Sequence, residues 1–388
     1  MIEHEDFLPY NLPDISDAEV DAVVDTLRSG WLAPGPRVRA FEADFAARVR
    51  AQHAIAVDSG TAGMHLALIA SGIGAGDEVI TTPMTFAATV NVIIHAGATP
   101  VLADVSEDDA CIEPAAVERA LTPRTKAIMP VHHGGAACRM EELRALAGAR
   151  GLRIIEDAAH ALGTEVCSVP VGGTGDAAVF SFYPTKNVTS GRGGMLTTDD
   201  EALAGRCRLL ALHGMSDDAW ERYTARGSWA YRVLAPGYNY AMSDLQAALG
   251  HAQFARLDEF QGKRRRFAER YNARFAELSE VVPPSERPGT THAWHLYVLR
   301  LRLERLRIGR DEFIEELRAR GIGTSVHFIP IHHHPYYREA YGWAPGDFPA
   351  ADRLFAEMIS LPLYTRMTDE AVDRVADAVE DIVRSNRR

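Results

Sequence analysis

Hydrophobic positions between residues 53 and 200 follow two alternating patterns. Short apolar, β-rich runs predict seven strands: "HAIAV", "DEVITT", "TPVLADV", "TKAIMPV", "LRIIEDA", "AAVFSF" and "GGMLTT". Helix-length stretches lie between them, and each closes on glycine: "TAGMHLALIASG", "TFAATVNVIIHAG" and "RMEELRALAGARG". This alternation predicts an α/β fold with a mostly parallel seven-stranded central sheet flanked by helices on both faces.

The segments on either side of this core predict further elements. Ahead of it, "SDAEVDAVVDTLRSG" has a capping box, Ser16 with Glu19, and predicts an N-terminal helix. Behind it, a helical stretch from about residue 243 to 278 is long enough to bridge two domains. After "VVPPSERPG" we expect an edge strand "WHLYVLRL", a helix at about 310–320, a strand "TSVHFIPI" and a last helix from about 368. We therefore expect a large domain, 1–250, and a smaller C-terminal α+β domain, 251–388.

Composition narrows the class of protein. The 388 residues are 47% hydrophobic and 24% charged, which is typical of a soluble globular chain. A net charge of −12 argues against a nucleic-acid or anionic-membrane partner. The N-terminus "MIEHEDFLPY" is not a basic-then-apolar leader, no apolar run reaches membrane-spanning length, and the four cysteines form no CxxC pair. We expect a cytoplasmic protein without a membrane partner.

One lysine is unusual in a chain that uses arginine for almost all of its positive charge. Of 41 lysine and arginine residues, only Lys126, Lys186 and Lys263 are lysine. Lys186 lies in "FSFYPTKNVTSGRGG", between a strand-like run and a glycine-rich turn. A partly buried lysine, unlike an arginine, can lose its proton and form a Schiff base. The alternative is an exposed loop charge, the usual environment of a lysine, so the surrounding residues have to decide.

Two motifs at strand ends complement such a lysine. "IIEDAAH" ends an apolar strand in Asp157, with His160 three residues later. A buried carboxylate needs a cationic partner, and the protonated pyridine nitrogen of an electron-sink cofactor is one. "VDSGTAGMHLAL" passes from a strand through Ser59, Gly60 and Thr61 into a helix, whose free N–H groups would bind a phosphate. The same turn is also compatible with an ordinary N-cap.

Two more residues extend the pattern. Ser181, five residues before Lys186, could add a hydroxyl to the same phosphate, or simply face outward from its strand. Phe86, in "TTPMTFAATVN", could lie on a heteroaromatic ring, or be a core phenylalanine. Taken together, an imine-forming lysine, a ring-nitrogen carboxylate, a stacking aromatic residue and a phosphate cradle predict a site for pyridoxal 5′-phosphate (PLP).

The ordered set of motifs resembles a known family. "FSFYPTKN" followed by "GG", with "EDAAHALG", "SGTAGMHLAL", "TTPMTFAATVN", "GYNYAMSDLQAALG" and "GIGTSVHFIPIH", is similar to the fold-type I PLP aminotransferases of the DegT type (DegT/DnrJ/StrS). The resemblance covers about residues 8 to 385. It implies amination of a keto group on a nucleotide-linked sugar.

The resemblance also implies roles for individual residues. Lys186 is implied to form the Schiff base and Asp157 to bind the pyridine nitrogen. Its other implied cofactor contacts are His160 near the ring hydroxyl, Phe86 on the ring face, and Gly60, Thr61, Ala62 and Ser181 on the phosphate. Asn239, in "GYNY", is implied to reach the phosphate of the neighbouring subunit, and hence a homodimer with shared active sites. His327 and Tyr183 are candidate substrate contacts, with aromatic packing as the alternative.

The chain departs from the family pattern at three places. Arg192 replaces a usual glutamate beside the lysine turn, and Ala33 and Pro34 stand where hydroxyl residues are common. These changes bear on the substrate and not on the cofactor. Additional histidines, His333 and His334, follow "IPIH".

These histidines raise the question of a metal. His332 and His334 would point the same way on a strand, and with His327 or the "VHHGG" pair they could bind zinc. No acidic or cysteine ligand stands at a suitable spacing, so we expect no metal site.

The implied reaction is a ping-pong transamination. Glutamate would displace Lys186 from its internal aldimine with PLP, and the freed lysine would move the proton as base and acid. Asp157 would keep the ring nitrogen protonated, 2-oxoglutarate would leave, and a keto sugar would receive the amino group. The alternatives are a transaminase of a cyclitol ketone, a dehydratase, which usually lacks the lysine, and a non-catalytic PLP-binding regulator.

Overall fold

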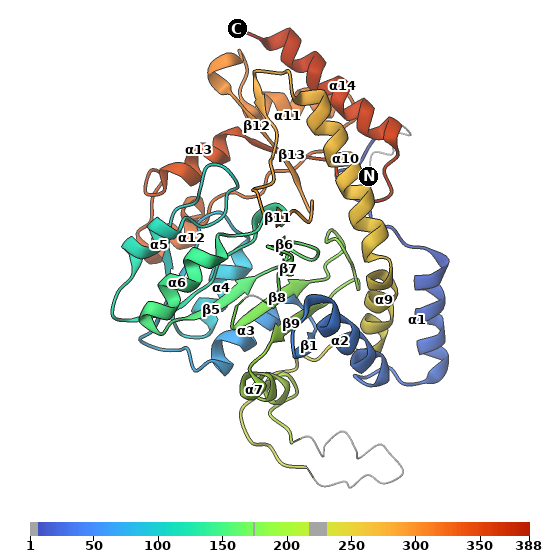
Figure 1. Cartoon of the computed structure of the whole chain (residues 1–388), viewed down its shortest axis with the longest axis vertical. Helices are drawn as coiled ribbons and strands as arrows, with labels where there is room; N and C mark the ends of the chain where they lie inside the picture. Colours follow the sequence, from blue (N-terminus) through green and yellow to red (C-terminus); the bar gives the residue numbers. More distant parts are fainter. Residues whose placement is uncertain (1–6, 174, 217–230) are drawn as a thin grey trace.

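The centre of the molecule is one sheet built from the seven predicted runs. The computed structural model describes residues 7–173, 175–216 and 231–388. The strands are β1 (His53–Val57), β2 (Glu78–Thr81), β3 (Thr99–Leu102), β4 (Thr125–Ile128), β5 (Arg153–Asp157), β8 (Ala177–Ser181) and β9 (Gly194–Thr198). Their order is β1-β9-β8-β5-β4-β2-β3. Figure 1 labels β1, β9, β8 and β5 of this sheet. Among these pairs, β9 is antiparallel to β1 and β8, and the others are parallel. The predicted α/β fold is confirmed.

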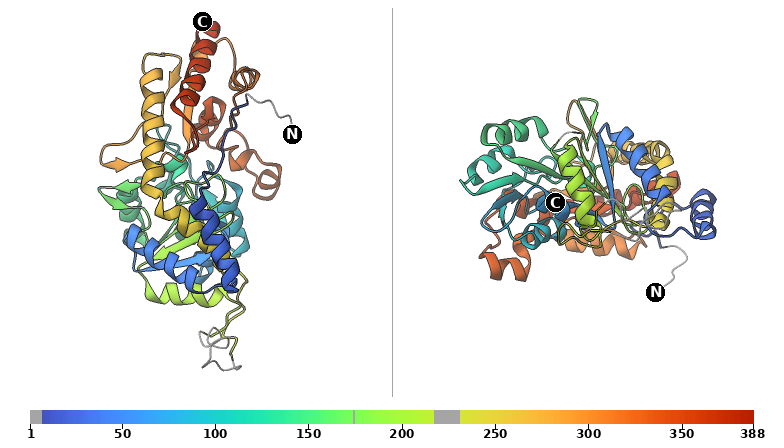
Figure 2. Two further views of the ribbon diagram at one scale, coloured as in Figure 1. Left: turned by 90° about the vertical axis from the view of Figure 1, so that its right-hand side faces the viewer. Right: turned by 90° about the horizontal axis from the view of Figure 1, so that it is seen from below.

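Helices cover both faces of this sheet (Figure 2), because each strand presents alternate side chains to opposite sides. In β8, Val179 belongs to one buried cluster and the adjacent Phe180 to another. The Val179 face is covered by α3 (Gly60–Ala70), α4 (Ala87–His95) and α7 (Glu201–Ala211). The opposite face is covered by α2 (Pro36–Val49), α5 (Pro114–Ala120) and α6 (Met140–Arg150).

The predicted N-terminal helix and the long helical stretch pack against each other. In α1 (Asp17–Ser29) the Ser16 N–H donates to Glu19 Oε2 at 2.7 Å, as the capping box predicts. The long stretch is two helices, α9 (Asp244–Ala255) and α10 (Leu257–Phe275), separated at Arg256. The guanidinium of Arg256 donates to Glu19 at 3.1 Å. This contact between distant parts of the chain lies at the break, and local periodicity does not reveal it.

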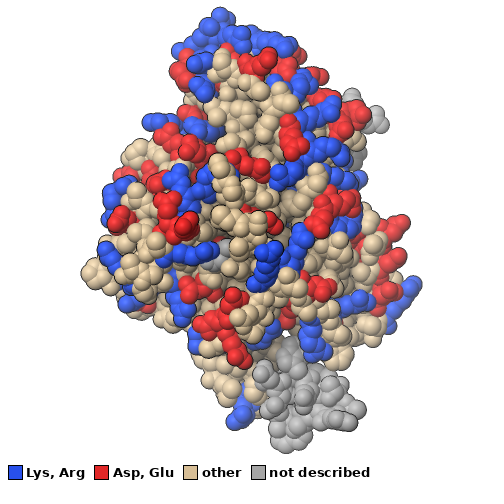
Figure 3. Space-filling model, in the orientation of Figure 1, with Lys and Arg blue, Asp and Glu red and all other residues tan. Residues whose placement is uncertain are grey.

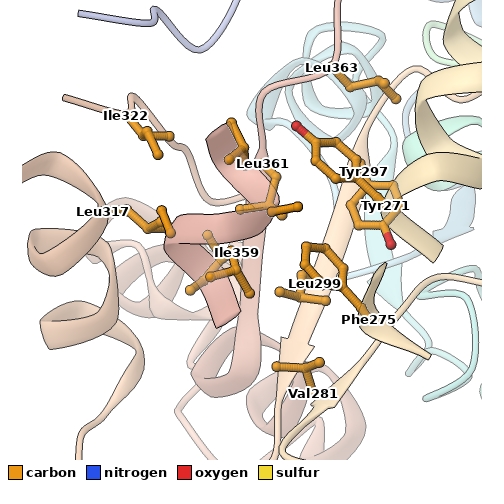
Figure 4. Close-up of a cluster of buried hydrophobic side chains, with 14 of the residues drawn as sticks. Tyr271, Phe275, Val281, Tyr297, Leu299, Leu317, Ile322, Ile359, Leu361 and Leu363 are labelled. Atoms are coloured by element: carbon orange, nitrogen blue, oxygen red, sulfur yellow. The ribbon is translucent and has the colours of Figure 1, made fainter. Parts of the chain in front are cut away.

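A second, smaller core lies around the far end of α10. β10 (Val281–Val282), β12 (Tyr297–Leu301) and β13 (Met358–Leu361) form an antiparallel sheet. It packs with α10, α11 (Arg310–Ala319) and α14 (Asp369–Asn386) around buried side chains that include Tyr271, Phe275, Leu299 and Ile359 (Figure 4). The domain boundary near residue 250 stays a prediction.

Two strand predictions for this part are wrong. "WHLYVLRL" is the middle strand and not an edge, because the unpredicted run "MISL" pairs with it as β13. "TSVHFIPI" is not a strand: it makes a single bridge, between Ser325 and Ser360, and leads into a 3₁₀ turn, η3 (Ile331–His333). Its end is held by the large part of the chain instead, since the Ile331 N–H donates to Pro83 O at 2.9 Å.

Charges on the surface are mixed in sign. Figure 3 shows lysine and arginine side chains interspersed with aspartate and glutamate across one face. Between α10 and α14 they pair directly, as in Arg270 with Asp373 and Arg274 with Glu380. Within the described ranges, no helix combines the length and the apolar character needed to cross a bilayer.

Candidate active site

The predicted site residues meet at one edge of the central sheet. All of its strands except β9 run in the same direction, so their carboxyl ends share that edge. Asp157 is the last residue of β5, and Ser181 is the last residue of β8. Gly60 opens the helix after β1, and Phe86 is the N-cap of the helix after β2. Chain direction therefore gathers residues that are far apart in the sequence.

Lys186 lies in the connection between β8 and β9, and its backbone is held in place. Its N–H donates to Tyr183 O at 2.9 Å. The next residue, Asn187, donates from Nδ2 to Ala293 O at 2.8 Å, and its Oδ1 lies 3.0 Å from Nδ1 of His295. The lysine turn is thus attached to the segment that leads into the smaller core.

The environment of Lys186 makes its amine easy to deprotonate. Burial disfavours the cation and lowers the pKa of Lys186 from 10.5 to about 8, although the Asp157 carboxylate acts in the opposite direction. The amine therefore changes protonation near neutral pH, as a nucleophile and proton carrier should. The alternative of a solvated loop charge does not fit this partly buried position.

This pKa predicts selective chemical labelling. In cofactor-free protein, we expect Lys186 to react with an amine-specific reagent with half-maximal rate near pH 8. Below that pH the amine is protonated and unreactive. At pH 8 its neutral fraction should exceed that of an ordinary lysine by roughly 10²-fold. Peptide mass spectrometry across the pH range measures this, with exposed Lys126 as the internal control. Parallel profiles for the two lysines would contradict the assignment.

Asp157 is buried and its two carboxylate oxygens have different donors. The Thr89 hydroxyl donates to Oδ2 at 2.7 Å, and the Ala159 N–H donates to Oδ1 at 3.1 Å. The hydroxyl of Thr85 lies 2.7 Å from that of Thr89 and supplies it with a proton in turn. This chain of hydroxyls fixes the orientation of the carboxylate.

We expect Thr89→Val to slow turnover without unfolding the protein. Valine has nearly the same shape but removes the donor to Asp157. A hydrogen bond to a charged group contributes about 1.5–3 kcal/mol, which corresponds to a loss in kcat/KM of roughly 10- to 100-fold. The matched control is Thr85→Val, which leaves the Thr89–Asp157 bond in place and should cost less. Equal activity in both variants and wild type would show that this bond does not matter.

His160 is held as a neutral ring. Its Nδ1 accepts the Gly134 N–H at 3.2 Å, so the proton is on Nε2, which is free to donate. Burial, followed by the nearby Lys186 cation, keeps the pKa of His160 well below its usual value. The ring also stacks on Phe328, with centroids 5.7 Å apart, and contacts His295 at 4.3 Å.

The start of α3 has the features of the predicted phosphate cradle. Gly60 and Thr61 are its first residues, so their N–H groups have no partner within the helix. The Ala62 N–H is bound by Ser59 Oγ at 3.2 Å, so the ordinary N-cap is present as well. A Cβ added to Gly60 would lie 3.2 Å from Cβ of Ser181, which shows how closely the two segments approach.

Phe86 is not a core residue. Its side chain is 64% exposed, and its ring centroid lies 6.2 Å from that of Phe328. The core alternative is therefore wrong. Such exposure leaves the ring face available to a planar ligand at the mouth of the site.

The remaining predicted residues are His327, Tyr183 and Asn239, and they differ in exposure. Nδ1 of His327 is 2.9 Å from Oγ of Ser360, and burial lowers its pKa to about 3. Tyr183 is 58% exposed, so the aromatic packing alternative fails for it. Asn239 is also exposed, on the segment before α9.

Sequence reasoning missed several residues that the fold brings together here. Thr89, His295 and Phe328 contact Asp157 or His160. Nε2 of His133 lies 2.9 Å from the carbonyl oxygen of His327 and so joins the two parts of the chain. For Thr89, the sequence offered one signal: it lies one helical turn after Thr85, the residue that directly precedes Phe86.

The comparisons with known proteins agree with this geometry. Residues 13–380 match the sequence model of the DegT/DnrJ/EryC1/StrS aminotransferase family. The chain belongs to this family. It is 52% identical over 379 residues, 97% of each chain, to the spore coat polysaccharide biosynthesis protein SpsC of Bacillus subtilis. The resemblance inferred from the motifs is confirmed.

Solved structures of the family are closely similar in fold. Spr1654 from Streptococcus pneumoniae, in its PLP form, is 31% identical with a TM-score of 0.91, covering 98% of this chain and 99% of that one. PseC from Helicobacter pylori, an aminotransferase involved in the biosynthesis of pseudaminic acid, is 29% identical with a TM-score of 0.90, covering 98% and 100%. The protein is thus a PLP-dependent sugar aminotransferase of the DegT/DnrJ/EryC1/StrS family.

The residues at the sheet edge fit PLP, the cofactor of this family. A Cβ added to Gly194 would lie 2.6 Å from the Gly60 nitrogen, so glycine is needed where β9 passes the helix start and Ser181. The result is a narrow cradle of N–H and hydroxyl groups suited to a phosphate. A deprotonatable amine, a carboxylate and an exposed aromatic ring stand beside it, as a charged pyridine ring requires.

Two departures from the DegT pattern have simple local structures. Arg192 is 71% exposed in its side chain and lies 3.9 Å from Asp58, so it is a surface cation beside the lysine turn. The carbonyl of Pro34 accepts from Trp31 Nε1 at 3.3 Å, which makes 31–34 a compact turn. Neither change touches the Asp157 and Thr89 network.

Proposed function

We propose that this protein transfers an amino group from glutamate to a keto group of a nucleotide-linked sugar, by a ping-pong reaction. The observation that carries the proposal is the Lys186 amine, with a pKa of about 8, on the same sheet edge as the oriented carboxylate of Asp157. When bound, PLP supplies an electron sink for the pair left on the donor carbon. Lys186 would accept the proton from that carbon as a base and would return it to the cofactor as an acid.

The other residues keep that proton transfer in place. Asp157 holds the proton on the ring nitrogen through a carboxylate fixed by Thr89 and Ala159. His160 donates from Nε2, because its Nδ1 is occupied by the Gly134 N–H. The bonds from Asn187 to Ala293 and His295 keep the lysine turn at the mouth of the site.

A nucleotide-linked sugar is supported by the relatives and by the open site. SpsC is named for spore coat polysaccharide biosynthesis, and PseC is described as an aminotransferase of pseudaminic acid biosynthesis. In this chain Phe86 and Tyr183 are 64% and 58% exposed. We assign His327 and Tyr183 to contacts with this acceptor.

We test the donor first and the acceptor second. Glutamate added to the PLP-loaded protein should bleach its visible absorption and release 2-oxoglutarate stoichiometrically. A nucleotide-linked keto sugar should then restore the spectrum, whereas a cyclitol ketone should not. No spectral change with glutamate would favour a non-catalytic PLP-binding regulator. If only the cyclitol ketone restored the visible spectrum, the acceptor would be a cyclitol ketone and not a nucleotide-linked sugar.

We further propose a homodimer in which Asn239 of one subunit completes the phosphate site of the other. Its exposed position on the segment before α9 supports this role. Mixing two inactive variants, Lys186→Ala and Asn239→Ala, should restore activity, because one site of each mixed dimer keeps both residues. Mixtures that stay inactive, although mixed dimers form, would contradict shared sites.

A further inference from the structure

A second cluster of titratable side chains involves η3, the 3₁₀ turn that follows the segment containing His327 and Phe328. His332 and His333 belong to this turn. The sequence offered no acidic residue at a suitable spacing to join them. The fold supplies one, because Asp352 in α13 (Pro349–Glu357) is directed at both rings.

Three ligand atoms converge at one point. Nε2 of His332 lies 2.7 Å from Oδ1 of Asp352, and Nε2 of His333 lies 2.5 Å from the same oxygen. All three ligand atoms lie within 4.8 Å of one another. The other histidine–carboxylate pairs recorded in the described ranges, such as His251 with Asp44, join one ring to one carboxylate.

The groups are held in this arrangement by their surroundings. The second oxygen of Asp352, Oδ2, accepts the Gly346 N–H at 2.6 Å. His332 packs edge-on against Phe348, with centroids 4.9 Å apart, and His333 packs against Phe355 at 5.3 Å. A carboxylate fixed by a backbone donor and rings fixed by packing form a preorganised donor set.

The donor set has the chemistry of a first-row transition-metal site. Two imidazole nitrogens and one carboxylate oxygen are ligands that Zn²⁺ prefers, and three protein ligands leave a fourth position for water. Around a tetrahedral zinc ion such atoms lie about 3.3 Å apart, so each of the two distances from a ring nitrogen to Oδ1 of Asp352 would need to lengthen by less than about 1 Å. The side chains of His333 and Asp352 are each 23% exposed, which gives an ion access.

We propose that His332, His333 and Asp352 bind one divalent transition-metal ion, best matched by Zn²⁺. The ion would connect η3 to α13 and so hold the segment that places His327 and Phe328 at the active site. Its role is structural, because the three residues lie outside the Lys186 and Asp157 network. The competing state is a purely hydrogen-bonded cluster in which both rings donate to Asp352.

Zinc titration of the chelator-treated, tag-free, PLP-loaded protein tests the proposal. We expect one Zn²⁺ per chain by calorimetry and metal analysis. In Asp352→Asn and His333→Asn the affinity should fall at least about tenfold. The matched control is Asp44→Asn, which breaks the single pair with His251 and should leave zinc binding unchanged. Equal zinc affinity in wild type and both site variants would overturn the proposal.

Two further measurements keep the test decisive if a variant folds poorly. Zn²⁺ should raise the thermal midpoint of wild type, and Mg²⁺ should not. Anomalous scattering at the zinc edge should show a peak between the rings of His332 and His333 and the carboxylate of Asp352. A peak elsewhere, or no stoichiometric binding, would leave the hydrogen-bonded cluster as the correct description.

Discussion

Replacing Lys186 with alanine should abolish transamination while leaving the protein folded. The proton transfer alone accounts for about 10²–10⁴-fold in rate, and the covalent attachment of the cofactor is lost as well. Lys186→Arg should be equally inactive, because a guanidinium keeps the charge but does not release its proton. The measurement is the glutamate half-reaction, followed by the release of 2-oxoglutarate.

Lys126→Ala is the matched control for this prediction. Lys126 is exposed on β4, and its removal should leave the half-reaction unchanged. A Lys186→Ala protein that still converts glutamate at a comparable rate would show that another group carries the proton. His160 would then be the first candidate, since burial keeps its ring neutral beside the lysine.

Replacing Asp157 with asparagine should reduce turnover by about 10²–10³-fold, the usual effect of losing one preorganised electrostatic group. Asparagine keeps the size of the side chain, but it removes the negative charge that holds the ring-nitrogen proton. The donors Thr89 and Ala159 stay in place to orient it. The glutamate half-reaction and the binding of PLP should be measured together, since both depend on this charge.

The neighbouring Glu156 provides the control for Asp157→Asn. It is equally buried in β5 but bonds to His132, whose Nε2 is 2.8 Å from its carboxylate. The Cys138 N–H donates to Nδ1 of His132 at 3.1 Å, so the ring proton is on Nε2 and is donated to the Glu156 carboxylate. Glu156→Gln weakens this hydrogen bond to a charged acceptor and should cost about 1.5–3 kcal/mol of stability, whereas turnover per folded molecule should be kept. A stability loss without a loss of turnover in Asp157→Asn would contradict its proposed role.

The sequence by itself determined the central sheet and the cofactor chemistry. All seven strands were predicted because each is a short apolar, β-rich run, and three of the stretches between them are helix-length and close on glycine, a pattern set by local periodicity. Lys186, Asp157, Gly60 and Phe86 could be placed at one edge because parallel strands bring their carboxyl ends together. The direction of the strands was enough to infer that these residues share one edge, and no knowledge of side-chain packing was needed.

Only the tertiary structure decided which other residues join the site. Thr89 reaches Asp157 across 68 positions, and Asn187 reaches His295 across 108, so neither contact has a signal in local spacing. The strand β13 and the break at Arg256 likewise depend on distant partners. The meeting of His332 and His333 with Asp352 has the same cause, because packing of α13 against η3 sets which side chains converge.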